Sequence, residues 1–383
     1  MTPSKGGPLG GVRILELAAL GPASFCGMVL ADFGAEVTRV DRPQGAIKGP
    51  LPDLGPDLLN RGKRSIVIDL QHPEGAEIVL ELAAKSDALI EGFRPGITEK
   101  LGVGPAHCLA RNPRLVYGRM TGWGQEGPLS DRAGHDIDFI ALSGVLGSIG
   151  GDDPVVPLNL VGDYGGGGML LAIGVLAGII SAIATGRGQV VDSSMIDGSA
   201  LLAVSHFGFL AGGSWSDRRA DNLLDGGAPF YTVYRTSDSR HIAVGALEPK
   251  FFDELIAGLG LSRFDVGDQY DRTGWSRMRE LFASTFAQNT RDHWEEVFDG
   301  RDACVVPVLR MAEAPKHPHN KARATFVNVA GITQPGPAPR FSATPNGKPG
   351  IPSQAGDSTD LILGSLGYSP DDVDRLRGQL IVY

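Results

Sequence analysis

Short apolar runs alternate with amphipathic stretches over the first third of the chain. Strands are predicted at residues 12–17, 36–40, 65–70, 88–91 and 115–120, and helices at 23–33 and 73–85. Apolar runs of this length, separated by helical patterns and by glycine or proline, are typical of βαβ units. The pattern therefore predicts an α/β fold whose large domain is built on a Rossmann-like parallel sheet.

The pattern changes after residue 227. Residues 230–235 and 241–247 alternate apolar and polar positions around the turn Ser237-Asp238-Ser239, which predicts an antiparallel hairpin. Helices at 250–259, 275–288 and 290–298 and a strand at 304–309 are expected to follow. We therefore expect a large α/β domain at 1–226 and a smaller α+β domain at 227–330. Residues 331–383 are expected to return the chain through a proline-rich stretch, with C-terminal helices packing on the large domain.

Between these regions lies the segment 134–168, in which His135 and Asp163 each sit beside glycine. The glycines allow backbone to approach a ligand closely, and a helix starting near Gly168 would aim free N–H groups toward Asp163. A helix cap remains an alternative role for Asp163, and a buried core histidine one for His135. Residues 169–184 carry no charge. They fall short of the roughly 20 residues of a membrane span, so we expect a helix buried on all sides.

Composition and charge narrow the possible functions. The 383 residues are 42 % hydrophobic and 21 % charged, an ordinary globular profile. The net charge of −9 argues against extensive contact with nucleic acid or an anionic membrane. The three cysteines are far apart and without metal-ligand spacing. No secretory signal is visible, so we expect a reducing, cytoplasmic location and no metal site. Residues 21–24 do not fit a dinucleotide-binding turn.

Basic residues gather near the carboxyl ends of the predicted strands, the edge at which open α/β sheets bind ligands. They are Arg42, Arg61, Lys63, Arg64, Arg94 and Lys100. The planar fork of arginine suits phosphate, so a phosphorylated small molecule could bind here. A solvated basic surface is the alternative for any one of them.

Three residues could carry acid–base chemistry. His135 exchanges protons near neutral pH, and Asp163 can do so if desolvation raises its pKa. Two such bases on opposite faces of a carbon beside a carbonyl permit a 1,1-proton transfer, with backbone N–H groups holding the enolate oxygen. Glu248 precedes Pro249 at a strand end. It could orient a histidine or simply begin a helix.

Nine motifs together are specific for one enzyme group. They cover residues 13–22, 30–37, 90–96, 120–125, 134–137, 159–163, 188–192, 224–229 and 244–249. In these motifs the chain is similar to the α-methylacyl-CoA racemases of the family III CoA-transferase superfamily, over nearly its whole length. The resemblance implies interconversion of R and S 2-methylacyl-CoA thioesters, a step of fatty acid metabolism. His135 and Asp163 would be the two bases, with Glu248 orienting His135.

The resemblance also implies that coenzyme A, bound only as part of the substrate and with no other cofactor, lies over the N-terminal α/β region. The implied contacts are Arg42, Ile68, Asp69, Leu70, Gln71, Gly92, Phe93, Arg94 and Lys100, with Gly134, Asp136, Ile137, Asp138 and Phe139 near the thioester. Arg61, Lys63 and Arg64 are added from charge alone. An interlocked homodimer is implied, whose site joins His135 and Asp163 of one chain to Glu248 of the other.

Two alternatives remain open. In a family III CoA-transferase, Asp163 would attack the thioester and carry the acyl group as a mixed anhydride. A CoA-binding regulatory protein would perform no chemistry.

Overall fold

The structure, a computed structural model, describes residues 6–43 and 55–383. The glycines and prolines of residues 44–60 predict an irregular loop, most of which lies outside the described residues. Its end forms a short 3-10 helix, η1 (Leu58–Asn60). The chain divides into two compact units. The first comprises residues 1–143, 157–203 and 324–383, and the second 144–156 and 204–323. The domain limits expected from the sequence stay a prediction.

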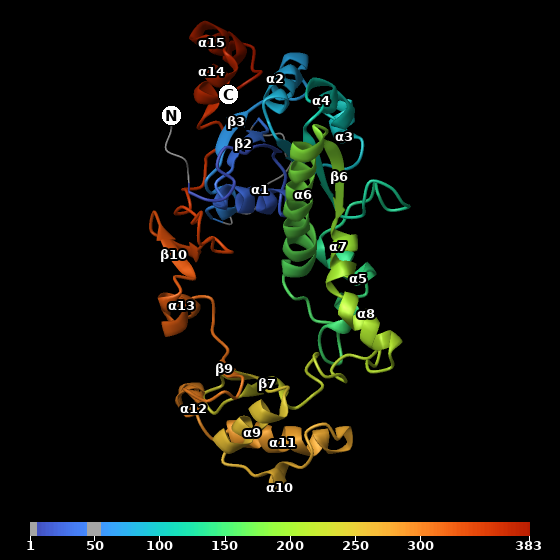
Figure 1. Cartoon of the computed structure of the whole chain (residues 1–383), viewed down its shortest axis with the longest axis vertical. Helices are drawn as coiled ribbons and strands as arrows, with labels where there is room; N and C mark the ends of the chain where they lie inside the picture. The colour runs from blue at the N-terminus through green and yellow to red at the C-terminus, as the bar shows by residue number, and fades with distance from the viewer. Residues whose placement is uncertain (1–5, 44–54) are drawn as a thin grey trace. The chain divides into compact units, whose positions relative to one another are not determined.

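A six-stranded parallel sheet organises the first unit, in the order β3-β2-β1-β4-β5-β6. Its strands β3, β2 and β6 are labelled in Figure 1. The strands are β1 (Arg13–Leu17), β2 (Glu36–Asp41), β3 (Arg64–Val67), β4 (Ala88–Glu91), β5 (Val116–Thr121) and β6 (Gln189–Ser194). This confirms the predicted α/β fold with a parallel sheet. Because successive strands move outward in opposite directions from the β1/β4 pair, their carboxyl ends open a crevice there.

Helices cover both faces of this sheet, and a two-stranded hairpin also belongs to the first unit. They are α1 (Pro22–Asp32), α2 (Pro73–Ala84), α3 (Ile97–Lys100), α4 (Pro105–Arg111), α5 (Asp136–Leu142), the π-helix η3 (Leu160–Met169), α6 (Leu170–Thr185), α7 (Met195–Leu202), α14 (Thr359–Leu366) and α15 (Pro370–Gly378). The hairpin pairs β10 (Phe326–Val329) with β11 (Ile332–Pro335). From the sequence, only a proline-rich stretch returning the chain to the large domain was expected there.

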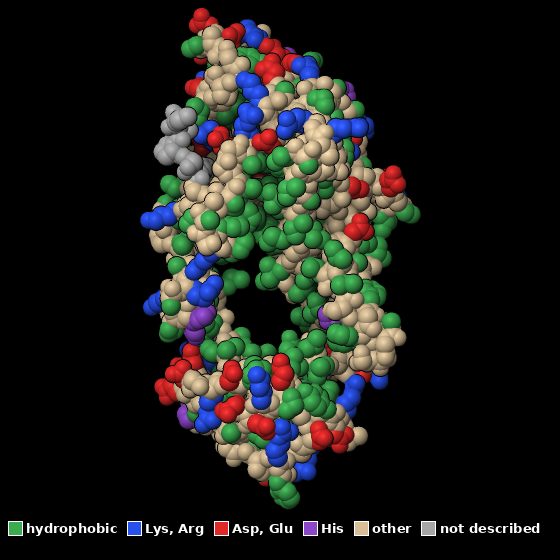
Figure 2. All heavy atoms as spheres, viewed as in Figure 1, with side chains coloured by type: hydrophobic (Ala, Val, Ile, Leu, Met, Phe, Trp, Pro, Cys, Tyr) green, Lys and Arg blue, Asp and Glu red, His purple; other side chains and the backbone are tan. Residues whose placement is uncertain are grey.

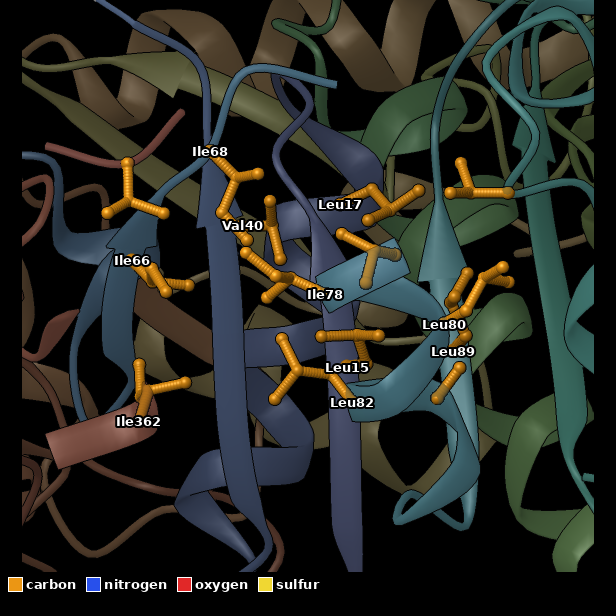
Figure 3. Close-up of a cluster of buried hydrophobic side chains, with 14 of the residues drawn as sticks. Leu15, Leu17, Val40, Ile66, Ile68, Ile78, Leu80, Leu82, Leu89 and Ile362 are labelled. Atoms are coloured by element: carbon orange, nitrogen blue, oxygen red, sulfur yellow. The ribbon is translucent and has the colours of Figure 1, made fainter. Parts of the chain in front are cut away.

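Buried side chains on the two sheet faces form two separate clusters. On β1, Leu15 and Leu17 pack with Ile78 of α2 and Ile362 of α14 in one cluster (Figure 3), whereas Ile14 joins the other. Successive strand residues point to opposite faces, so β1 contributes apolar side chains to the clusters on both sides of the sheet. The C-terminal residues complete the first cluster, and the backbone N–H of Asp69 donates to the Ile381 carbonyl at 2.9 Å.

The expectation of a helix buried on all sides at 169–184 is wrong for the single chain. Leu171, Val175 and Ile179 of α6 are buried, but Ile180 and Ile183 are 68 % and 70 % exposed. Hydrophobic side chains are accordingly visible over α6 in Figure 2. The continuous helix 160–185 is the one helix in the described ranges long and apolar enough to cross a membrane, and 44 % of its most apolar window is buried.

The helix also begins earlier than expected, at Leu160 rather than near Gly168. The intervening residues form the π-helix η3, so Asp163 lies within the helix and not in front of it. The four glycines left no apolar period from which this turn could be predicted. The sequence predicts one helix over residues 197–209, but α7 ends at Leu202 with Ala203 as its C-cap.

A three-stranded antiparallel sheet forms the centre of the second unit, in the order β7-β8-β9. Its strands are β7 (Tyr231–Arg235), β8 (His241–Gly245) and β9 (Val305–Pro307), so the predicted hairpin is confirmed. Its helices are η2 (Leu146–Ser148), α8 (Val204–Ala211), α9 (Pro249–Gly258), α10 (Arg263–Val266), η4 (Arg272–Gly274), α11 (Trp275–Phe286), α12 (Arg291–Phe298), η5 (Ala314–Lys316) and α13 (Pro318–Ala322).

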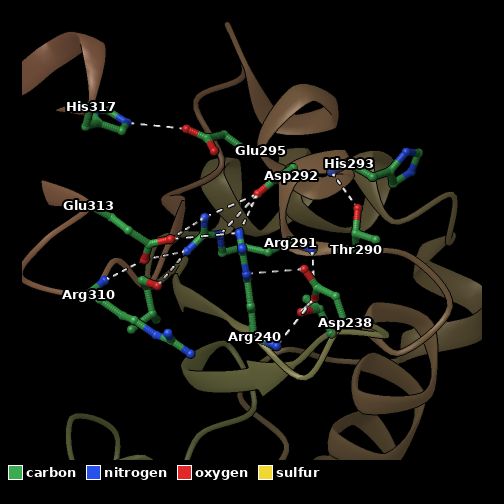
Figure 4. Close-up of polar contacts among 12 residues, drawn as sticks. Asp238, Arg240, Thr290, Arg291, Asp292, His293, Glu295, Arg310, Glu313 and His317 are labelled. Atoms are coloured by element: carbon green, nitrogen blue, oxygen red, sulfur yellow. Dashed lines mark hydrogen bonds and ion pairs between the residues drawn. The ribbon is translucent and has the colours of Figure 1, made fainter.

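An ion-pair network fixes the end of this unit (Figure 4). Arg291, only 6 % exposed, donates to Glu313 from both terminal nitrogens at 3.1 and 3.3 Å. The backbone N–H of Arg310 also donates to Glu313, at 2.8 Å. Together, these bonds hold the pKa of Glu313 at about 2, well below its usual range. The network ties the segment after β9 to α12.

Candidate active site

A cavity of about 970 Å³ lies in the first unit at the carboxyl ends of four parallel strands. Its walls come from the turns that follow β1, β2, β3 and β4, the crevice that this sheet order predicts. The lining residues are Ala18, Ala19, Leu20, Arg39, Asp41, Arg42, Pro43, Ile68, Asp69, Leu70, Gln71, Gly92, Phe93, Arg94, Ile97, Leu101 and His135.

The structure brings most of the residues expected to contact coenzyme A to this one cavity. Arg42, residues 68–71 and residues 92–94 line it together with His135. Lys100, Gly134 and residues 136–139 are not among its lining residues. Ala18, Ala19 and Leu20 also line the cavity but were not predicted from the sequence. They directly follow β1, and the expectation that ligands bind at the carboxyl ends of parallel strands, which placed Arg42, applies equally to them.

Three arginines, Arg39, Arg42 and Arg94, line the cavity. The guanidinium of Arg42 lies over the ring of Phe93, 4.7 Å from its centroid, an attractive cation–π arrangement. Arg39, also missed from the sequence, donates from Nε to Asp41 at 2.9 Å and bonds Asn60. Arg39 lies inside β2, and successive residues of a strand face opposite sides of the sheet. Its place in the sequence alone therefore did not assign it to the edge of the sheet where ligands bind.

The three basic residues added from charge alone serve the structure instead. Arg61 pairs with Asp32 at 2.5 Å and donates to the Gln334 side chain at 2.8 Å. Lys63 is fully buried with its Nζ 2.6 Å from Glu16. Arg64, half-exposed, lies 3.9 Å from Glu36. The predicted phosphate role of these residues is wrong, because the cations of Arg61 and Lys63 are neutralised inside the fold and none of the three lines the cavity.

His135 is held in place at the beginning of α5. It occupies the N-cap position, and its backbone N–H donates to the Asp138 carboxylate at 2.9 Å. A Cβ on Gly134 would lie 2.6 Å from the ring of Phe139, so this glycine permits aromatic packing just before the histidine. The imidazole itself is exposed and lines the cavity. A buried core histidine is therefore excluded.

Asp163 lies on η3 close to the turn after β1. Its carboxylate accepts a hydrogen bond from the Asn159 side chain at 2.9 Å, and a Cβ on Gly21 would come within 3.4 Å of it. Its backbone N–H donates to Asp136 at 2.7 Å. Partial burial raises the pKa of Asp163, against the hydrogen bond from Asn159, and the charge of Asp136 raises this pKa further while that of His135 lowers it. Asp163 and His135 thus share one electrostatic environment.

The glycines after Asp163 bring protein segments together and do not line the cavity. A Cβ on Gly166 would lie 2.6 Å from the backbone nitrogen of Ser199 in α7, and one on Gly168 would lie 2.5 Å from the Pro22 carbonyl in α1. The expected close approach is therefore to neighbouring helices rather than to a ligand. This packing fixes η3, and with it Asp163, against α1 and α7.

Glu248 lies in the second unit, directly before α9. It occupies the N-cap position, but its exposed side chain makes no capping hydrogen bond. The preceding carbonyl, of Leu247, accepts hydrogen bonds from Gln269 at 2.8 Å and from the hydroxyl of Tyr270 at 2.7 Å. These bonds hold the backbone at Glu248 while leaving its carboxylate unengaged by the helix.

Metal-binding side chains do not cluster in residues 6–43 and 55–383. No group of three or more histidine, cysteine, aspartate or glutamate residues in these ranges could hold a metal ion.

Comparison with known proteins places this geometry in a family. The family model of the CoA-transferase family III matches residues 9–355. Alpha-methylacyl-CoA racemases of mouse and human are each 44 % identical over 382 residues, covering 98 % of this chain and 97 % of theirs. Human succinyl-CoA:glutarate CoA-transferase is 30 % identical, covering 98 % of this chain and 89 % of its own.

A solved structure supports the same assignment of the fold. The CAIB/BAIF family protein of Brucella suis superimposes with a TM-score of 0.81 at 24 % sequence identity, covering 94 % of this chain and all of that one. The family model and the close relatives agree over nearly the whole length. The chain therefore belongs to CoA-transferase family III.

Proposed function

We propose that this protein is a racemase that interconverts the R and S isomers of 2-methylacyl-CoA thioesters. The observation that carries the proposal is the 44 % identity with two alpha-methylacyl-CoA racemases over 98 % of the chain. The cavity supports it, because Arg42 and Arg94 line the wall and offer positive charge for phosphates. His135 lines the same cavity.

Proton transfer at the carbon beside the thioester carbonyl needs a base on each face. His135 and Asp163 are the proposed pair, with the proton removed by one and a new proton delivered by the other. Burial raises the pKa of Asp163, which brings the carboxylate closer to the range in which it can both accept and donate a proton.

The enolate oxygen formed on the thioester requires hydrogen-bond donors that are already in place. The first residues of α5, Asp136 and Ile137, follow His135 directly, and the opening backbone N–H groups of a helix have no partner within it. We assign the oxyanion to this helix start. Glu248, whose carboxylate does not cap α9, is assigned to orient the imidazole of His135.

The chemistry requires no metal, flavin, pyridoxal phosphate or nicotinamide, since the thioester itself acidifies the α-carbon. Coenzyme A enters only as part of the substrate. A cytoplasmic location and a homodimer with interlocked chains complete the proposal. The exposed Ile173, Ile180 and Ile183 of α6 support a dimer, because a second chain could cover an apolar surface of this kind.

The alternative is a CoA-transferase in which Asp163 attacks the thioester, and the 30 % identity to human succinyl-CoA:glutarate CoA-transferase keeps it in view. Incubation with one enantiomer of a 2-methylacyl-CoA in deuterated water distinguishes the two. A racemase forms the opposite enantiomer with deuterium at the α-carbon and needs no acyl acceptor. Absence of exchange, together with a hydroxylamine-trapped acyl group on Asp163, would decide for the transferase.

A further inference from the structure

A buried carboxylate lies directly behind the cavity wall. Glu91, the last residue of β4, is fully buried, and its neighbours Gly92, Phe93 and Arg94 line the cavity. Burying a charged group is unfavourable unless hydrogen bonds and an opposite charge compensate. No step assigned to His135, Asp163 or Glu248 uses Glu91, so its retention in the core calls for another explanation.

Both carboxylate oxygens of Glu91 are engaged. Oε2 accepts the backbone N–H of Phe93 at 2.7 Å, and Oε1 accepts Nε–H of Arg119 at 2.9 Å. Arg119, on β5 and only 7 % exposed, donates from its two terminal nitrogens to Glu99 of α3 at 2.8 and 3.3 Å. Glu91 thereby ties the turn after β4 to the next strand and, through Arg119, to α3.

The turn that Glu91 holds carries the ring beneath Arg42. The backbone N–H of Phe93 is fixed by Glu91, and the ring of Phe93 lies 4.7 Å below the Arg42 guanidinium. A Cβ on Gly92 would lie 2.8 Å from the Cβ of Ala19, so the turn also fits closely against another part of the cavity wall. A small rotation of this turn would move Phe93, and with it the Arg42 side chain, away from the cavity.

Opposing effects act on the pKa of Glu91. Burial raises its pKa to about 7, against the hydrogen bond from Phe93 and the positive charge of Arg119, while the charge of Glu99 raises it further. Around neutral pH, the carboxylate therefore exchanges between an ionised form that accepts both hydrogen bonds fully and a neutral form that accepts them less well. Arg119 of β5 and Glu99 of α3 are the charged groups that face it, and Tyr117 of β5, whose pKa is raised, stays neutral in this range.

We propose that Glu91 is a positioning residue for substrate binding, which holds the Gly92–Arg94 turn, and through Phe93 the Arg42 guanidinium, in the geometry that receives the anionic part of the CoA thioester. The inference rests on the proposed function and deepens it, since it names a residue that acts on binding and not on proton transfer.

The test compares Glu91→Gln with the wild type and with Glu77→Gln. The amide removes the charge while keeping the shape of the side chain. Without this charge-assisted hydrogen bond the turn leaves its binding geometry more often, and a ligand that binds only that geometry is held about tenfold more weakly. We expect KM for the thioester and the Kd of free coenzyme A, measured by calorimetry, to rise by this factor, with kcat nearly unchanged. Glu77→Gln makes the same chemical change in the exposed ion pair with Arg111, outside the cavity wall, and should leave both constants unchanged.

The pH dependence supplies a readout that a purely structural role would not move. The wild-type carboxyl becomes neutral as pH falls through about 7, whereas the amide does not titrate. The ratio of KM values, Glu91→Gln over wild type, should therefore be largest at pH 8.5 and shrink toward one at pH 6. Should Glu91→Gln fail to fold, Glu91→Asp replaces it. The shorter acid cannot span both partners but still titrates, so KM should rise and keep its pH dependence.

Three results would overturn the inference. The first is an unchanged Kd for coenzyme A in Glu91→Gln when Arg42→Ala weakens binding. The second is a fall in kcat at constant KM, which would mean that Glu91 acts on folding or on the chemical step and not on binding. The third is wild-type protein that does not bind coenzyme A at all, which would overturn the proposed function as well.

Discussion

Proton transfer on both faces of one carbon makes each base indispensable in both directions. In the proposed mechanism, His135 takes the α-proton of the S isomer and Asp163 that of the R isomer. Replacing His135 with alanine should lower the rate of racemisation by about 10²–10⁴-fold in both directions. Slow deuterium exchange of the R isomer through Asp163 should remain. Chiral separation of the products formed in deuterated water measures both quantities.

The matched control for this change is His107→Ala, an exposed histidine on α4 that does not line the cavity. It should racemise at the wild-type rate. A His135→Ala enzyme that still racemises, or that accumulates an acyl group on Asp163, would contradict the two-base assignment.

Arg42 illustrates how a binding contact differs from a catalytic one. Its guanidinium reaches the cavity over Phe93. Loss of a charge-assisted phosphate contact costs about 1.5–3 kcal/mol. Arg42→Ala should therefore raise KM for the thioester with little effect on kcat, because the contact is made equally in the ground state and in the transition state. Arg64→Ala removes the same charge outside the cavity wall and should change neither; equal KM values for the two variants would exclude Arg42 from binding.

The basic residues show which part of the site can be predicted from the sequence and which part cannot. Strand ends are recognisable from apolar runs, so Arg42 and residues 92–94 were correctly expected at one edge of the sheet. Which way a cation points depends on partners distant in the chain. Lys63 meets Glu16 across 47 positions, and Arg61 meets Gln334 across 273, pairings that no local pattern contains.

At the scale of elements, that buried pair joins three parts of the first unit. Lys63 Nζ, just before β3, contacts Glu16 of β1 at 2.6 Å and donates to the Ser24 carbonyl of α1 at 3.0 Å. Removing one partner of a buried pair leaves an uncompensated charge, at a cost of about 3–5 kcal/mol. Lys63→Ala should lower the free energy of unfolding by this amount in urea titrations.

The matched control is Arg111→Ala. Arg111 pairs with Glu77 at the same 2.6 Å distance, but both side chains are close to half-exposed. Exposed pairs contribute about 0–1 kcal/mol, so the control should unfold almost as the wild type does. If the two variants lost equal stability, the pair of Lys63 and Glu16 would not hold these elements together.

Elements with a clear hydrophobic period were predicted well, and those built on glycine were not. The strands of the parallel sheet and the β7–β8 hairpin follow their apolar patterns closely. The π-helix η3 and the β10–β11 hairpin do not. In η3, glycines carry the chain past α1 and α7, and close backbone approach is a tertiary property. The site therefore depends on the element that periodicity described least, because Asp163 lies on η3.

At the scale of the whole molecule, stretches far apart in the sequence share one core. The first unit is assembled from three separate stretches of chain, and the last of them, 324–383, supplies Leu363 and Leu376 to the same core as Leu15 of β1. Which side chains of distant stretches meet in this core is a tertiary property that local periodicity does not encode. The exposed apolar residues of α6 likewise became visible only in the folded chain.

A homodimer in which Glu248 of one chain orients His135 of the other can be tested by combining variants. Differently tagged His135→Ala and Glu248→Gln chains are co-expressed and the heterodimer is purified. A two-fold dimer has two equivalent sites, so one of them would then hold both native residues, and about half of the wild-type activity should return. The matched control places both substitutions in one chain and pairs it with a wild-type chain. Each site then lacks one residue, and activity should be low. If both residues came from the same chain, the results would reverse: the control would keep about half of the activity, and the first heterodimer would only average its two parents.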